Sequence, residues 1–263
     1  MKEWPLILFT LATQLACGLT LAAAVFDANA SPAEKGLMRP LAMAIFPLVA
    51  SGILLSMAHL GRPLMAWRAV VNLERSRLSR EVILTAVFGL VALAYSGFWW
   101  MGRTDGRLAL GAAACAAGVA SVMAAAAVYK VPTRPVWNSG WVPASFLGTA
   151  VLLAGLAPAL LIPWRGNAGW LRLFLGAGVA GSSLLLVAAL WMAAKSSMSK
   201  KSFWLGCHIA FASVLPVALV FRFWPAERVQ IALFAWPALA VVVFGAAIGR
   251  ALMYSSGTRR SSF

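Results

Sequence analysis

The sequence predicts an all-α integral membrane protein, a bundle of eight transmembrane helices. Hydrophobic residues make up 62% of the 263 residues and charged residues only 11%, whereas roughly a quarter of a soluble domain is charged. Eight apolar runs have the length of about 20 residues that a hydrocarbon core of about 30 Å requires. Because the connections are short, we expect residues 1–263 to form a single membrane domain.

Hydropathy places the eight spans between short polar or basic connections. Their predicted ranges are 4–26, 37–59, 82–101, 107–129, 141–163, 170–193, 203–223 and 229–253. The first run could be mistaken for a secretory signal, because Ala28-Asn29-Ala30 resembles a cleavage site. It is 23 residues long, however, and a signal needs an apolar core of only about 7 to 15. We therefore expect a spanning helix.

The later spans are expected to pack in different ways. The fourth, GAAACAAGVASVMAAAA, consists almost entirely of small residues, which let other helices approach closely and predict a central position in the bundle. Prolines inside spans are expected to be tolerated as kinks, because neighbouring helices can satisfy the freed backbone groups. These prolines are Pro47, Pro158, Pro216 and Pro237.

The formal charge of +15 comes from 22 Lys and Arg against 7 Asp and Glu. In a soluble protein this imbalance would suggest a nucleic-acid partner, but here the charges lie between apolar runs and indicate topology, so no nucleic acid is expected. Fourteen of the 22 basic residues lie on the side that holds both termini and the connections after spans 2, 4 and 6. The positive-inside rule therefore places both termini and the 60–80 loop in the cytoplasm.

Two rare residues flank that loop. His59 ends span 2 and Glu81 begins span 3, so both side chains return to the same membrane face. An imidazole and a carboxylate at one interface can handle protons. Glu81 could equally be an acid in the first turn of a helix behind Ser79, and His59 could be a helix-end residue that faces headgroups. The loop between them carries Arg62, Arg68, Arg75, Arg77 and Arg80.

Other candidate ligands are few. His208, near the same face, could hold a b-type haem together with His59, or it could be a packed or hydrogen-bonded side chain. Gln14 in span 1 is expected to hydrogen-bond another helix. The sequence predicts no metal site on this chain, because the cysteines lack the spacing of zinc or iron–sulfur ligands. These cysteines are Cys17, Cys115 and Cys207.

Four segments resemble the DmsC family, the membrane anchor subunits of dimethyl sulfoxide reductase. They are EWPLILFTLATQ, SMAHLGRPLMAW continuing to LSREV, VYKVPTRPVWNSGWVP from Val128, and IGRALMY from Ile248. The resemblance spans nearly the whole sequence, and His-Leu-Gly-x-Pro followed by a Glu is specific as a combination. One departure is FGAAIGR in the last span, where Ala246 or a neighbour replaces an acidic residue of the family pattern.

The resemblance implies a quinol-handling anchor in a heterotrimer with a molybdenum catalytic subunit and an iron–sulfur subunit. The anchor, similar to polysulfide reductase membrane subunits, is expected to carry no haem. The quinol-site histidine of the family matches His59 and its essential glutamate matches Glu81. Possible secondary site residues are Gln14, Arg62 and Arg80, and partner docking is assigned to Arg68, Arg75 and Arg77.

The resulting hypothesis is that menaquinol or ubiquinol enters from lipid between spans 2 and 3. His59, with an unperturbed pKa of about 6.5, accepts one proton and Glu81 the other. The electrons pass to an iron–sulfur cluster of a partner docked on the 60–80 loop. One alternative is the reverse reaction, quinone reduction, as in sulfite oxidation. Another is a stand-alone transporter, which predicts an internal repeat or a polar midplane pathway, and neither is visible in the sequence.

Overall fold

The structure is a computed structural model that describes residues 4–58, 73–134, 137–162, 168–195, 202–223 and 229–256. Eight helical segments in it are long and apolar enough to cross a membrane. The predicted fold class, an all-α membrane bundle with eight spans, is confirmed.

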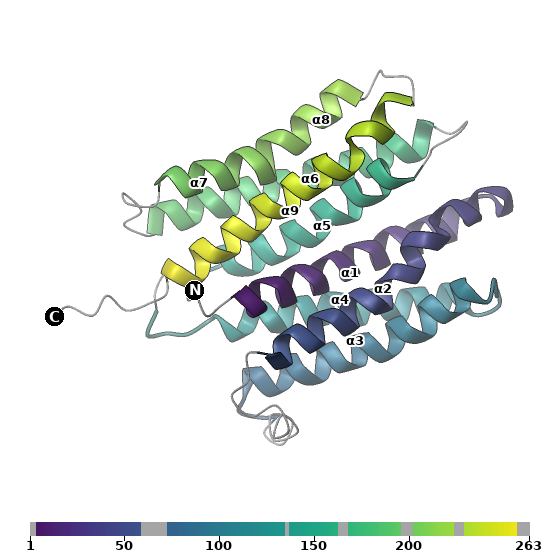
Figure 1. The fold of residues 1–263 in the computed structure, drawn as a ribbon. Coiled ribbons are helices and arrows are strands. Elements are labelled where there is room, and N and C mark those ends of the chain that lie inside the picture. Colours follow the sequence, from purple (N-terminus) through teal and green to yellow (C-terminus); the bar gives the residue numbers. More distant parts are fainter. Residues whose placement is uncertain are drawn as a thin grey trace.

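Each predicted span corresponds to one helical segment. The first six are α1 Trp4–Asn29, α2 Pro32–Ala58, α3 Arg77–Trp100, α4 Arg107–Val128, α5 Trp141–Leu161 and α6 Ala168–Lys195. The seventh is α7 Ser202–Ile209, a π-helical turn Ala210–Val214 and α8 Leu215–Phe223, and the eighth is α9 Val229–Ser256. The helices lie side by side in two groups, α1–α4 and α5–α9 (Figure 1). The first residues of α1 and the last residues of α9 lie at the same end of the bundle, which is called the terminal end below.

Two helices begin about five residues before the predicted spans because polar caps start them. Before α2, the backbone N–H of Ser31 donates to the Glu34 carboxylate at 3.1 Å, which is a capping-box contact, and proline occupies the first helical position, where its missing N–H costs nothing. Before α3, the Ser76 hydroxyl accepts a hydrogen bond from the N–H of Ser79 at 3.2 Å. Hydropathy does not detect such polar first turns.

The seventh span changes its winding in the middle of the membrane. The N–H of Leu215 reaches back five residues to the Ala210 carbonyl, and the following Pro216 has no N–H to donate. A single π-turn before a proline redistributes the backbone hydrogen bonds around the missing donor. His208 lies just before this turn.

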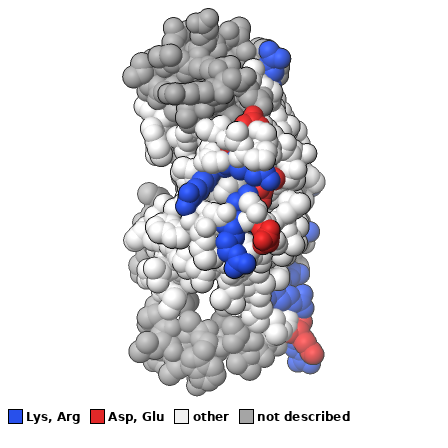
Figure 2. Space-filling model, turned by 90° about the vertical axis from the view of Figure 1, so that its right-hand side faces the viewer, with Lys and Arg blue, Asp and Glu red and all other residues white. Residues whose placement is uncertain are grey.

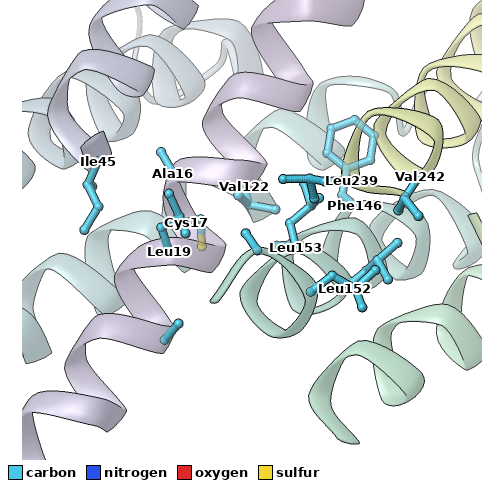
Figure 3. Close-up of a cluster of buried hydrophobic side chains, with 14 of the residues drawn as sticks. Ala16, Cys17, Leu19, Ile45, Val122, Phe146, Leu152, Leu153, Leu239 and Val242 are labelled. Atoms are coloured by element: carbon cyan, nitrogen blue, oxygen red, sulfur yellow. The ribbon is translucent and has the colours of Figure 1, made fainter. Parts of the chain in front are cut away.

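The core lies where α1 and α5 bring the two groups together (Figure 3). A Cβ on Gly18 of α1 would lie 2.5 Å from the Ala150 carbonyl oxygen of α5, so the two backbones are in direct contact. Buried residues make up 78% of the spanning stretch of α5 and 67% of that of α1, but only 33% of that of α4. The predicted central position of α4 is therefore wrong. Its small residues instead accommodate large side chains of α3, such as the Tyr95 ring against Gly111.

Candidate functional site

The Glu81 side chain is buried near the start of α3, at the terminal end of the bundle. It is 7% exposed. The cap of α3 is Ser76, and the first turn contains no acidic residue, so Glu81 is the fifth helical residue. The alternative that Glu81 stabilises its own helix as a first-turn acid is therefore wrong, and its burial has another cause.

The arginines around Glu81 bind backbone carbonyls. The Arg77 guanidinium donates to the carbonyls of Ala127 and Lys130 at the end of α4. The Arg80 guanidinium donates to the carbonyls of Leu73 and Glu74 at 2.9 and 2.5 Å. Within the described part of the protein, neither forms an ion pair with Glu81. His59, Arg62 and Arg68 lie outside the described residues.

A pair of tyrosines lies at the same end of the bundle as Glu81. The hydroxyl oxygens of Tyr129, at the end of α4, and Tyr254, in the last turns of α9, are 3.0 Å apart. Both tyrosines are close enough to Glu81 to interact with it electrostatically. Burial, together with the neighbouring Tyr254, raises the pKa of Tyr129 well above its usual value. Tyr129 is therefore a neutral hydroxyl at physiological pH and can donate a hydrogen bond to an oxygen.

Trp137 fixes this pair from the connection between α4 and α5. Its indole N–H donates to the Met253 carbonyl of α9 at 2.9 Å, and its ring packs edge-on against Tyr129 at 5.5 Å between centroids. The VYKVPTRPVWNSGWVP segment thereby joins α4 to the end of α9. The side chain of Tyr129 is held in place on two sides.

Arg250 lies one turn deeper in α9 than Tyr254 and is 3% exposed. Its guanidinium donates to the Ser145 hydroxyl of α5 at 2.9 Å and to the Gln14 side-chain oxygen of α1 at 2.9 Å, with a longer contact of 3.4 Å to the Thr149 hydroxyl. It also stacks over the Phe146 ring at 3.7 Å. Gln14 therefore makes the predicted interhelical hydrogen bond, and its partner is the arginine.

A small cavity separates Arg250 from His208. It has a volume of about 10 Å³, which is room for about one water molecule. His208 Nδ1 is 2.8 Å from the Gly245 carbonyl, so this nitrogen carries a proton, and the ring lies against Gly249, where a Cβ would be 2.5 Å away. The packed, hydrogen-bonded alternative for His208 is the arrangement that the structure shows, and the haem alternative also needs His59, which lies outside the described residues.

The opposite end of the bundle carries a separate ionic cluster. The Arg107 guanidinium binds both oxygens of the Asp27 carboxylate, at 2.6 and 2.9 Å, and the Lys35 ammonium lies 3.2 Å from the same carboxylate. Lys, Arg, Asp and Glu side chains lie next to one another on this face (Figure 2). Asp27 has its charge compensated within the cluster, which joins α1, α2 and α4. Glu81 has no such compensation among the described residues.

Comparison with known proteins identifies the family. The family model "DMSO reductase anchor subunit (DmsC)" matches residues 1–256. The YnfH subunit of an anaerobic dimethyl sulfoxide reductase of Escherichia coli is 31% identical over 169 residues, 60% of this chain and 57% of the relative. The C subunit of the E. coli anaerobic dimethyl sulfoxide reductase is 27% identical, over 64% of this chain and 60% of the relative. The C subunit of the Haemophilus influenzae enzyme is 26% identical, over 72% and 69%.

The alignments thus span less than two thirds of the length of the two E. coli relatives. The family model, in contrast, covers nearly the whole sequence, with all eight spans and the Glu81, Tyr129 and Arg250 positions inside its range. The chain belongs to the DmsC family of DMSO reductase anchor subunits.

Proposed function

We propose that this chain is the membrane anchor and quinol-oxidising subunit of a molybdenum and iron–sulfur oxidoreductase complex. The observation that carries this proposal is the buried Glu81 carboxylate at the terminal end, which no cation within the described residues pairs. An uncompensated carboxyl group at membrane depth is a functional candidate, because burial without a partner is costly. Membership of the anchor family supports the complex.

The chemistry requires two proton acceptors and one electron acceptor. A hydroquinone loses two protons and two electrons when it becomes a quinone. In the proposal, Glu81 takes one proton directly from a hydroquinone O–H group, and His59, which matches the family motif, takes the other. Tyr129 and Tyr254 remain neutral. Because their hydroxyls share one hydrogen bond, one O–H of the pair is free to donate to a ring oxygen. Menaquinol and ubiquinol both have the chemistry that this arrangement needs.

The electrons leave to an iron–sulfur cluster of a partner subunit on the same face. The partner docks at the 60–80 loop, and a molybdenum subunit bound to that partner reduces the terminal substrate. Of the described loop arginines, Arg75 is exposed, whereas Arg77 and Arg80 bind backbone carbonyls. The docking charge is therefore assigned to Arg68 and Arg75, and Arg77 mainly stabilises the end of α4.

The sidedness follows from the basic residues. The terminal end and the partner face the cytoplasm of a bacterium, and the protein lies in the inner membrane as one domain. The reverse reaction, quinone reduction, would use the same groups with the protons flowing in the opposite direction.

The experiment is quinol-driven reduction of the partner's iron–sulfur clusters in membranes, followed by EPR. Glu81→Gln keeps the shape of the side chain and removes the proton acceptor, so we expect cluster reduction to slow by about 100-fold or more. His59→Ala is expected to be similarly slow. Glu74→Gln, a change at an exposed acid of the same loop, is the matched control and should behave as the native protein. Native rates in a fully assembled Glu81→Gln complex would exclude Glu81 as the acceptor.

A further inference from the structure

Arg250 carries a buried positive charge that no carboxylate among the described residues pairs. None of the described carboxylates lies within ion-pair distance of it. Its partners are the neutral oxygens of Ser145, Gln14 and Thr149, and its Nε has no partner among the described residues. A structural tie between helices would not require a full charge, which is costly to bury.

Arg250 lies one helical turn from Tyr254, the α9 member of the tyrosine pair. Arg250 and Tyr254 are four residues apart on α9, which is a rise of about 6 Å on the same helix face. Arg250 interacts electrostatically with both Tyr129 and Tyr254, and Glu81 interacts with the same two hydroxyls. The tyrosine pair is therefore coupled electrostatically to both the carboxyl group and the guanidinium.

When Glu81 is protonated, the groups around this pair favour a negative charge. The two tyrosine hydroxyls share one hydrogen bond, which leaves one neutral O–H free to donate, and the guanidinium adds a permanent positive potential. His208, which also lines the cavity beside Arg250, adds no negative charge, and its Nδ1–H is donated to the Gly245 carbonyl. In the weakly polarisable interior of a membrane bundle, such a potential reaches further than it does in water. This potential stabilises a bound neutral ligand little, whereas it stabilises a bound anionic ligand strongly.

Taking the proposed function as the basis, we propose that Arg250 is a positioning residue that makes the quinol site prefer an anionic quinoid ligand. In the reaction, an O–H bond of the hydroquinone breaks and an O–H bond forms on Glu81, which leaves the hydroquinone monoanion. Arg250 stabilises this anion through Tyr254. The anion then loses its remaining proton to His59 and two electrons, which iron–sulfur clusters of the partner would accept one at a time, and becomes the quinone.

The test compares two probes that differ in charge. One is an alkylated hydroxynaphthoquinone, whose acidic hydroxyl is ionised at neutral pH, and the other is its methyl ether, which cannot ionise. Binding of each is measured to the intact complex in lipid nanodiscs, for the native protein and for Arg250→Gln, Arg250→Lys and Arg39→Gln. Arg39 is exposed at the opposite end of the bundle and serves as the control for loss of one charge.

We expect the native protein to prefer the anion and Arg250→Gln to lose that preference by a factor on the order of tenfold, the scale of the effect of one charge in a medium of intermediate polarity. Arg250→Lys and Arg39→Gln should keep the preference. Partition of each probe into lipid is the same for all four proteins and cancels in their ratios. If Arg250 had only a structural role, its replacement would weaken the binding of both probes equally, or Arg250→Lys and Arg250→Gln would change binding to the same extent. Either result overturns the inference.

The native protein tests the inference even if Arg250→Gln does not assemble. A native preference for the methyl ether, after correction for the concentration of each probe in the membrane, would refute the role of Arg250. Binding of both probes without a preference would do the same and leave the quinol site intact. Binding of neither probe would instead refute the proposed function.

Discussion

At the residue scale, the terminal end combines a carboxyl group, two hydroxyls and a guanidinium that come from α3, the end of α4 and α9. Glu81 lies near the start of α3, Tyr129 follows α4, and Tyr254 and Arg250 lie on α9. The Tyr129–Tyr254 contact of 3.0 Å connects the first half of the sequence with the second. The chemistry of the site depends on which of these groups change their charge.

Tyr129 is expected to make the stability of the protein sensitive to alkaline pH. Burial raises the pKa of its phenol above the usual value, which is ~10. The folded protein therefore holds this proton where the unfolded protein has lost it, and the free energy of unfolding falls as the pH rises above ~10, by at most about 1.4 kcal/mol per pH unit for one group.

Thermal unfolding of the purified protein between about pH 8 and 11 measures this slope. Tyr129→Phe, which keeps the ring and removes the hydroxyl, should show a shallower fall in the midpoint than the native protein. An unchanged slope in Tyr129→Phe would mean that other groups cause the alkaline loss.

At the element scale, the bundle depends on close contact between α1 and α5. Gly18→Ala would place a methyl carbon 2.5 Å from the Ala150 carbonyl oxygen and 2.8 Å from the Ala154 nitrogen. Because both are backbone atoms, the helices must separate, and we expect the free energy of unfolding to fall by about 1–3 kcal/mol.

Gly176→Ala on α6 is the matched control, since a Cβ there meets nothing within 4 Å. Its unfolding midpoint in detergent should equal or exceed that of the native protein. If Gly18→Ala were as stable as Gly176→Ala, the contact between α1 and α5 could not be as close as described.

Hydropathy predicts all eight spans because an apolar run of about 20 residues is imposed by the bilayer itself. It misplaces the starts of α2 and α3, because Ser31, Glu34 and Ser76 act through hydrogen bonds and contribute no hydrophobicity. The small residues of α4 wrongly predict a central helix, because they indicate close packing without indicating which neighbour packs there.

The candidate site could be predicted only in part. Glu81 stands out in the sequence as a rare acid at a membrane face. Arg250 counts there among the charges that set topology, although it lies inside the predicted span 229–253, where an ionisable residue is itself a functional signal. The sequence predicts that its partner Gln14 forms a hydrogen bond with another helix, but it does not indicate which helix. Tyr129 and Tyr254 are 125 residues apart, and periodicity gives no information on such contacts.

At the scale of the whole molecule, the two ends of the bundle differ in whether their buried charges are paired. The end with the α1–α2 and α3–α4 connections contains the compensated cluster of Asp27, Arg107 and Lys35. The terminal end contains Glu81 and Arg250, neither of which is paired within the described residues. Buried apolar side chains from α1, α2, α4, α5 and α9 form the core of the bundle (Figure 3). We therefore propose that quinol chemistry takes place at the terminal end.

Photoaffinity labelling with an azido-quinone, followed by mass spectrometry of the labelled peptides, tests that placement most directly. Labels are expected on peptides from the start of α3, the end of α4 and the end of α9, and excess quinol should suppress them. Quinol-protected labelling confined to peptides around Asp27, Lys35 and Arg107 would contradict the placement, because it would put the quinol site at the opposite face of the membrane.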